Sequence, residues 1–275
     1  MVEILKAILF GIVEGVTEWL PISSTGHLIL LQGFMELQVS QSFSAMFEVM
    51  IQLGAILAVI LLFFRKLDPL DRHKSERERR MTWRLWSAVA VAVLPSGVLG
   101  LLLDDWMEAH LHGPLVVCAM LILYGVAILL AERRSALRPP VLRSVWEIDR
   151  KTALRIGCFQ ALSLVPGTSR SGATILGAML LGVDRAAGAE FSFFLAIPTM
   201  VGAGIVRGVK FAVSGAGITA LEAGILLTGC AVSFLVSGLV VRGLMDYVRS
   251  RSFAAFGVYR IVLGLLILGS YVFAK

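Results

Sequence analysis

The sequence is poor in charge and in cysteine. Only 16% of its 275 residues are charged, whereas a soluble domain of this size carries about 25%. Hydrophobic residues make up 57% of the chain, and the mean hydropathy is +0.85. These values argue against a water-soluble enzyme, a disordered chain and a nucleic-acid-binding module. The three cysteines lie in apolar stretches without a CxxC pair or metal-ligand spacing, so they imply neither a disulfide framework nor a metal site.

Long apolar runs with almost no charge recur along the chain. The hydrocarbon core of a bilayer is about 30 Å thick, and a helix needs roughly 20 apolar residues to cross it. Six runs have about this length: 43–64, 85–103, 114–131, 190–206, 218–241 and 254–273. The sequence therefore predicts an all-α polytopic membrane protein with six transmembrane helices.

Two further apolar stretches, 4–35 and 153–183, are interrupted in the middle. The interruptions read Pro-Ile-Ser-Ser-Thr-Gly at 21–26 and Pro-Gly-Thr-Ser-Arg-Ser-Gly at 166–172. Proline removes a helix donor, and small polar residues favour turns and helix caps. Irregular backbone at membrane depth is tolerated only where protein or a water-filled cavity surrounds it. Both stretches are therefore predicted to be re-entrant helix–loop–helix pairs whose loops meet inside the protein.

Basic residues are concentrated in alternate loops. Loop 65–84 holds eight, segment 132–155 holds seven and loop 242–253 holds three, whereas loop 207–217 holds two and loop 104–113 holds none. If the richest loops are cytoplasmic, the spans alternate correctly only when each interrupted stretch makes no net crossing. Both termini then lie outside, and the positive charge is an orientation signal.

The same topology divides the chain into two halves of opposite orientation. Residues 1–136 and 137–275 each form a re-entrant pair followed by three spans, within one integral membrane domain. An odd number of spans inverts the second copy, so the halves are expected to form an inverted repeat. In such folds, broken helices meet near the midplane and form a substrate site between the halves.

A weak internal similarity supports this repeat. The segment 11–26 aligns with the segment that lies 146 residues further along the chain. The alignment pairs Glu14 with Gln160 and Ser23 with Ser169. The two interrupted loops are therefore expected to occupy equivalent places in the two halves.

The first interrupted stretch carries an unusual set of polar residues. Glu14 and Glu18 are four residues apart, so a helix presents both carboxylates on one face, where they can share a cation. Four more polar residues follow: Ser23, Ser24, Thr25 and His27. Ionisable residues inside a membrane indicate function by default. The alternative is an interfacial segment with hydrated glutamates, whose hydroxyls cap a helix expected to begin near Leu28.

The second interrupted stretch carries Arg170, the sole basic residue between Arg155 and Arg185. An unpaired arginine in an apolar region is unfavourable, so Arg170 requires a carboxylate or a bound anion. Small and hydroxyl residues surround it: Gly167, Ser169, Ser171, Gly172 and Thr174. A helix N-terminus, which also favours anions, is expected to follow. The alternative is an internal ion pair with Glu14 or Glu18 that holds the two halves together without chemistry.

Together, the two loops contain the groups that phosphoryl transfer needs. They supply a cation and backbone donors for phosphate oxygens, a hydroxyl nucleophile, and a carboxylate or histidine to move its proton. The chain has no Walker A and no dinucleotide-binding glycine motif. A PAP2-type lipid phosphatase is disfavoured, because Leu176 stands where that class has a histidine after its Ser-Arg pair.

Four segments resemble the undecaprenyl-diphosphatase (bacitracin-resistance, UppP/BacA) family of bacterial inner-membrane proteins. They are EGVTEWLPISSTGH at 14–27, FEVMIQLGAILAV at 47–59, PGTSRSGATI at 166–175 and EFSFFLAIP at 190–198. The resemblance implies hydrolysis of C55 undecaprenyl diphosphate to undecaprenyl phosphate and phosphate, which recycles the lipid carrier for peptidoglycan synthesis. It also implies a role in cell-wall biogenesis and cell shape, bacitracin resistance, an inverted-repeat fold and an active site facing the periplasm.

The resemblance also assigns roles to particular residues. Ser24 would be the nucleophile, with Glu18 as base or cation partner. Arg170 would bind the pyrophosphate, and His27 would have a catalytic or phosphate-binding role. Attack by a water molecule activated by Glu18 would use the same residues, and the sequence does not separate the two routes. The residues expected to line the substrate site are Glu14, Ser23, Thr25, Gly26, Gly167, Ser169, Ser171, Gly172 and Thr174.

The expected partners are a polyprenyl diphosphate lipid and the bilayer, and no nucleic acid; a homodimer stays an open hypothesis. Divalent cations such as Mg²⁺ or Ca²⁺ are associated with the family, and Glu14 and Glu18 are the carboxylates that would bind one. The chain contains no compact metal motif, so no cofactor is assigned. The alternative function is a transporter or flippase of a polyprenyl phosphate lipid, alone or beside the phosphatase. It would need Arg170 but no nucleophile.

Overall fold

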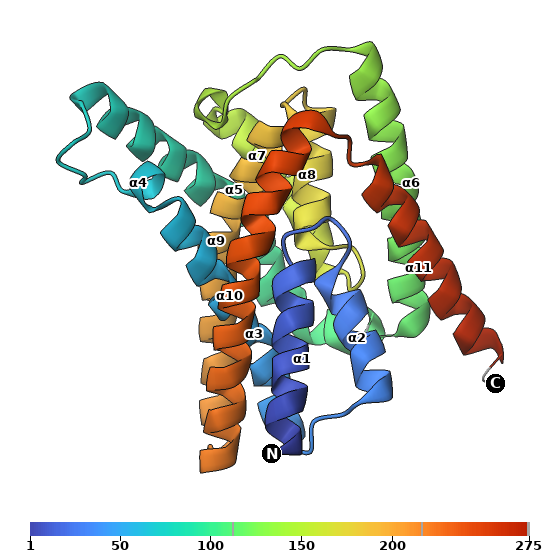
Figure 1. The fold of residues 1–275 in the computed structure, drawn as a ribbon. Coiled ribbons are helices and arrows are strands. Elements are labelled where there is room, and N and C mark those ends of the chain that lie inside the picture. The colour runs from blue at the N-terminus through green and yellow to red at the C-terminus, as the bar shows by residue number, and fades with distance from the viewer. Residues whose placement is uncertain (112, 216, 274–275) are drawn as a thin grey trace.

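The computed structural model describes residues 1–111, 113–215 and 217–273, and within these ranges the chain folds almost entirely into helices (Figure 1). The α-helices are α1 (Val2–Thr17), α2 (Ser24–Phe34), α3 (Gln41–Leu62), α4 (Phe64–Leu67), α5 (Glu76–Leu111), α6 (Pro114–Leu137), α7 (Arg150–Ala161), α8 (Arg170–Leu180), α9 (Arg185–Val213), α10 (Ala220–Ser250) and α11 (Ala254–Phe273). Two 3-10 turns, η1 (Val145–Glu147) and η2 (Leu162–Leu164), flank α7. The described residues include no β-strand beyond an isolated bridge between Leu142 and Val183.

Six of these helices are long and apolar enough to cross a membrane: α3, α5, α6, α9, α10 and α11. They coincide with the six predicted spans, so the prediction of an all-α protein with six transmembrane helices is confirmed. Several boundaries differ: α10 ends at Ser250, inside the predicted loop 242–253, and α5 begins at Glu76, inside the segment 65–84 that was expected to be a loop. Ser75 and Glu78 explain this start: each side chain accepts a hydrogen bond from the other's backbone N–H, which forms a capping box.

Helices α1, α2, α7 and α8 are too short to cross a bilayer. They contain 16, 11, 12 and 11 residues. At 1.5 Å per residue the longest extends about 24 Å, less than the hydrocarbon thickness of about 30 Å. In Figure 1, α1 rises from the lower end and α2 returns to it, whereas α7 and α8 enter from and return to the upper end. This path is compatible with the predicted re-entrant pairs 4–35 and 153–183.

Contacts between helices follow a similar plan in the two halves. Helix α10 packs against both α1 and α3, and α5 packs against both α7 and α9. Further contacts join α3 to α9, α6 to α11 and α8 to α9. If α1, α3, α5 and α6 correspond to α7, α9, α10 and α11, each of these contacts has a counterpart except that of α8 with α9. The arrangement is compatible with the predicted inverted repeat of 1–136 and 137–275, although residues 112, 216 and 274–275 lie outside the described part.

Glycines allow several of these helices to approach closely. A Cβ atom added to Gly157 of α7 would lie 2.2 Å from the carbonyl oxygen of Ala92 on α5. A Cβ added to Gly54 of α3 would lie 2.3 Å from the carbonyl oxygen of Cys230 on α10. Small residues at such crossings bring helix backbones into van der Waals contact inside a membrane. Gly157 thus allows α7, and with it the second loop, to lie close against α5.

We expect Gly157→Ala to lower the free energy of unfolding by about 1–3 kcal/mol, because the new methyl group forces α5 and α7 apart. Gly238→Ala is the matched control, since a Cβ added to that glycine in α10 meets no atom within 4 Å. The measurement is thermal unfolding of both variants in the same detergent. Equal melting temperatures for the two variants would contradict the close packing described here.

Candidate active site

The two interrupted loops meet near the middle of the molecule, where the loop after α1 lies beside the start of α8 (Figure 1). The hydroxyl of Ser171 donates to the backbone carbonyls of Glu18 and Leu20, both at 3.0 Å. Segments about 150 residues apart in the sequence are therefore joined directly. Polar groups buried this deeply must find protein partners, and each loop supplies partners for the other.

The Glu18 carboxylate is the central group of this junction. The Ser24 hydroxyl donates to its Oε2 atom at 2.6 Å, and the Arg170 Nη2 atom donates to its Oε1 atom at 2.8 Å. All three side chains are largely buried, with Glu18 and Ser24 only 6% and 8% exposed. An ion pair between Arg170 and Glu14 or Glu18 was the non-catalytic alternative given above, and the structure shows the pair with Glu18. The same carboxylate, however, also accepts the hydroxyl hydrogen of the predicted nucleophile.

Arg170 also contacts α9 and an aromatic ring. Its Nη1 atom donates to the carbonyl of Ser192 at 2.8 Å, and its guanidinium lies 5.5 Å from the centre of the Trp19 ring. The Nε atom of Arg170 is buried and has no partner among the described residues. Thr174, a predicted site residue, shares a 2.5 Å hydrogen bond with the Ser192 hydroxyl. Two sides of the guanidinium are thus fixed, while one donor remains unused.

Both loops use the same strained backbone to start the helix that follows. Ser23 and Ser169 have φ angles of 74° and 71°, and they are the sole non-glycine residues with positive φ in the described ranges. Each hydroxyl caps its helix by accepting from a backbone N–H, that of Gly26 at 3.3 Å and that of Gly172 at 3.1 Å. Such conformations cost about 1–3 kcal/mol and are concentrated at functional sites. The sequence alignment had paired these two serines.

The cap at Ser23 corrects one expectation. Helix α2 begins at Ser24, four residues before the predicted start near Leu28, because the first hydroxyl of the run provides the cap. Ser24 and Arg170 are therefore the first residues of α2 and α8. Since both contact Glu18, the N-terminal ends of both helices lie beside the same carboxylate. The partial positive charge of two helix N-termini favours an anion at this point.

His27 is held by two contacts on either side of its ring. Its Nδ1 atom lies 2.7 Å from the carbonyl oxygen of Ser23, and its Nε2 atom lies 2.7 Å from the hydroxyl of Tyr259. A carbonyl only accepts, so the Nδ1 atom carries the proton and the Nε2 atom accepts from the tyrosine. The two rings also stack, with centroids 5.7 Å apart. In this geometry Glu18, and not His27, contacts the Ser24 hydroxyl.

Glu14 lies beside this network without joining it. Its carboxylate is fully buried, and neither oxygen has a hydrogen-bond partner among the described residues. Glu18 and Glu48 are near enough to act on it electrostatically, and Glu48 itself accepts from the Gln32 amide at 2.5 Å. The described residues contain no group of three or more His, Cys, Asp or Glu side chains arranged for a metal ion. A buried carboxylate without a partner still suits a cation that also binds substrate oxygens.

The remaining predicted residues have structural contacts at the loops. The Ser169 and Ser171 hydroxyls lie 3.2 Å apart. Gly167 has a φ of +89°, and a Cβ added there would lie 2.7 Å from the backbone of Val117, so this position requires glycine. Thr25 is exposed and takes part in none of the contacts described above. The structure thus brings most, but not all, of the predicted residues together.

Arg260 lies in the last span, where the sequence alone allows two roles. Its side chain could reach a phosphate or extend to the membrane interface. The structure instead buries it completely, where it donates to the carbonyls of Pro21, Gly167 and Thr168 at 3.2, 2.9 and 2.9 Å. These carbonyls belong to both interrupted loops. Arg260 therefore fixes the two loops relative to each other.

We expect Arg260→Met to loosen both loops, because three buried carbonyls lose their donor at about 1–3 kcal/mol each. The observable results are faster hydrogen exchange over residues 166–172 and at least a tenfold fall in any turnover at the site. Arg133→Met, which changes an exposed arginine of α6, is the control. Unchanged exchange in the Arg260 variant would show that the carbonyls do not need the guanidinium.

These features define a class of protein: a polytopic helical membrane protein in which a buried carboxylate contacts both a serine hydroxyl and an arginine. The chain belongs to the bacitracin resistance protein BacA family, because the model of that family matches residues 7–266.

Three proteins named undecaprenyl-diphosphatase are similar to this chain over almost their whole length. The protein of Lactiplantibacillus plantarum is 52% identical over 271 residues, covering 98% of each chain. That of Enterococcus faecalis is 52% identical over 269 residues, covering 97% of this chain and 96% of its own. The protein of Streptococcus thermophilus is 50% identical over 268 residues, covering 98% of this chain and 93% of its own.

Proposed function

We propose that this protein is a membrane enzyme that hydrolyses undecaprenyl diphosphate to undecaprenyl phosphate and phosphate. The observation that carries the proposal is the Glu18 carboxylate, which contacts the hydroxyl of Ser24 and the guanidinium of Arg170 at 2.6 and 2.8 Å. Relatives that are about 50% identical along the whole chain bear the name undecaprenyl-diphosphatase. The site supplies a base, a hydroxyl and a cation, which are the groups that this reaction requires.

The diphosphate enters where two helix N-termini and Arg170 already favour an anion. The unused Nε donor of Arg170 is available to a phosphate oxygen. Arg170 neutralises charge that builds up on these oxygens in the transition state. Because Glu18 shares the same guanidinium, arrival of the substrate weakens the ion pair and leaves the carboxylate oriented by its bond to Ser24.

The reaction then proceeds in two steps. The Ser24 oxygen forms a bond to the terminal phosphorus while its proton moves to Glu18, and the bond from that phosphorus to the bridging oxygen breaks to release the lipid monophosphate. A water oxygen then forms a bond to the phosphorus while the bond from phosphorus to the serine oxygen breaks. Glu18 returns its proton to the serine oxygen, and phosphate leaves with both protons of the water. Attack by a water molecule that Glu18 activates would use the same groups without the covalent step. The separation between Ser24 and Glu18 fits proton transfer in the first route directly.

Glu14 and Glu18 are the residues that would hold a divalent cation. A bound Mg²⁺ or Ca²⁺ would neutralise part of the charge of the diphosphate, and such ions accept one or two carboxylates together with phosphate oxygens. Glu14 suits this role because its buried oxygens have no hydrogen-bond partner in the described chain. The lipid substrate and the bilayer are the partners that the proposal requires.

We place the protein in the bacterial cytoplasmic membrane, with the basic loops on the cytoplasmic side. Loops 65–84, 132–155 and 242–253 carry most of the lysine and arginine and lie at the upper end of Figure 1. By the positive-inside rule this end faces the cytoplasm. The α1–α2 pair then opens toward the periplasm, and so does the active site. Removal of the diphosphate lipid, the target of bacitracin, accounts for resistance to that antibiotic.

A direct test is phosphate release by the purified protein in detergent, supplied with a long-chain polyprenyl diphosphate. We expect turnover by the unchanged chain and by Arg133→Ala, and a strongly reduced rate by Arg170→Ala. Lipid binding that depends on Arg170, without phosphate release by the unchanged chain, would overturn the proposal and indicate a transporter. A transporter, however, has no need of the contact between Ser24 and Glu18.

A further inference from the structure

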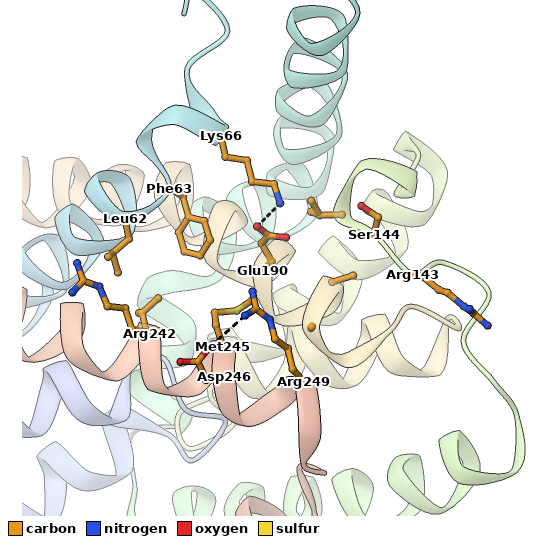
Figure 2. Close-up of a pocket in the computed structure, with 14 residues that line it drawn as sticks. Leu62, Phe63, Lys66, Arg143, Ser144, Glu190, Arg242, Met245, Asp246 and Arg249 are labelled. Carbon is orange, nitrogen blue, oxygen red and sulfur yellow. Dashed lines mark hydrogen bonds and ion pairs between the residues drawn. The ribbon is translucent and has the colours of Figure 1, made fainter. Parts of the chain in front are cut away.

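A second polar site lies away from the interrupted loops, at the upper end of the molecule. A cavity of about 470 Å³ lies between the end of α3, the beginning of α9 and the end of α10 (Figure 2). Its lining includes the apolar side chains of Leu62, Phe63, Val241 and Met245. The charged side chains on it are Lys66, Arg143, Glu190, Arg242, Asp246 and Arg249. An apolar floor and a charged rim are thus combined in one cavity between membrane-spanning helices.

Glu190, one of the two acidic residues on the cavity, is already neutralised by Lys66. Glu190 accepts a hydrogen bond from Lys66 at 2.6 Å, and the ammonium group of Lys66 also lies 5.2 Å from the centre of the Trp146 ring. From the sequence alone, Glu190 could belong to the active site or have a structural role. The structure places it in this cavity. The charge that remains available to a ligand is therefore that of the arginines, offset in part by Asp246.

Two of these arginines lie on the same face of α10. Arg242 and Arg249 are seven residues apart, which corresponds to two helical turns. Both are exposed, and Arg249 makes a 3.4 Å contact with the exposed Asp246, a pair of little strength in water. Arg143 points away from the cavity (Figure 2), so it does not enter the argument.

We propose that this cavity binds the phosphate headgroup of an anionic membrane phospholipid. Arg242 and Arg249 would contact the phosphodiester, and the apolar floor at Phe63 and Met245 would receive the glycerol and the first acyl carbons. Basic pockets between transmembrane helices on the cytoplasmic side are suited to anionic headgroups. The apolar floor favours a lipid over inorganic phosphate, because a free phosphate ion gains nothing from carbon atoms. The residues involved are separate from those assigned to hydrolysis.

The test is native mass spectrometry of the full chain in detergent, titrated with phosphatidylglycerol or phosphatidylcholine. The variant Arg242→Gln/Arg249→Gln removes two cationic side chains from the cavity. Arg133→Gln/Arg138→Gln removes two exposed arginines near the end of α6 and is the matched control. We expect the unchanged chain and the control to bind phosphatidylglycerol more tightly than phosphatidylcholine. The cavity variant should lose this preference, with an apparent Kd for phosphatidylglycerol raised by about tenfold or more.

Two results would overturn the proposal. One is an equal Kd for phosphatidylglycerol in the cavity variant and in the control, since the cavity would then not be the lipid site. The other is displacement of phosphatidylglycerol by millimolar inorganic phosphate in the unchanged chain, which would identify a site for small anions. Because the exchanged arginines are exposed, we expect all variants to retain the melting temperature of the unchanged chain, which confirms that they are folded.

Discussion

Replacing Arg170 with alanine is expected to lower kcat/KM for polyprenyl diphosphate hydrolysis by about 10³–10⁵-fold. An arginine that stabilises the transferring phosphoryl group contributes an effect of this size. No other cation contacts Glu18 among the described hydrogen bonds and ion pairs, so the chain has no ready substitute. Phosphate release at several substrate concentrations measures the effect. A variant that is folded and has near-normal kcat/KM would remove Arg170 from the site.

Arg170→Ala also has a structural consequence that must be separated from the catalytic one. It leaves the buried Glu18 without its cation, and breaking such a pair destabilises a protein by about 3–5 kcal/mol. Arg170→Lys retains a positive charge beside Glu18 but loses the planar fork that contacts both Glu18 and Ser192. We therefore expect the lysine variant to melt near the unchanged chain while still losing about 10²-fold in kcat/KM.

Replacing Ser24 with alanine is expected to lower kcat by about 10³-fold or more while KM changes little. The hydroxyl is the group that forms the bond to phosphorus, whereas binding of the diphosphate depends on Arg170 and the helix N-termini. The Ser24 hydroxyl is buried and donates to Glu18, so its removal also tests whether that contact is used in the reaction. Ser270→Ala, which removes a hydroxyl bonded within α11, is the matched control.

Near-normal turnover of Ser24→Ala would eliminate the covalent route. Glu18 would then act on a water molecule, and Glu18→Gln should abolish turnover while Ser24→Ala does not. A large loss in both variants supports the serine route. Acid quenching of the unchanged chain during turnover of substrate labelled in its terminal phosphate should in that case recover labelled phosphoserine at position 24.

The sequence was sufficient for much of the architecture. Long apolar runs predicted the six spans, because only a helix of about 20 apolar residues satisfies a bilayer. Pro21 and Pro166 interrupted two further runs, and helices too short to span are found there. Arg170 had to find an anion, so its pairing with Glu14 or Glu18 was foreseeable. The choice between them was not, because both glutamates lie on one face of the same helix.

Contacts between segments that are far apart in the chain could not be predicted from the sequence. Tyr259 and Arg260 lie on the last helix, and nothing in their neighbourhood indicates which loop they reach. The position of α11 against α6 and the loops determines this, and it results from packing of whole helices. Ser192 lies within a motif typical of the family, yet its role toward Arg170 depends on the rotation of α9. The contacts of such residues can be identified only in the folded structure.

The most direct measurement is a double-mutant cycle on phosphate release, using Glu18→Gln, Arg170→Lys and the combined variant. If one carboxylate couples the two loops into a single site, the losses are strongly non-additive, and the double variant is about as slow as the slower single variant. Losses that multiply in the double variant would mean that Glu18 and Arg170 act independently. That result would contradict the central claim that the two interrupted loops form one active site.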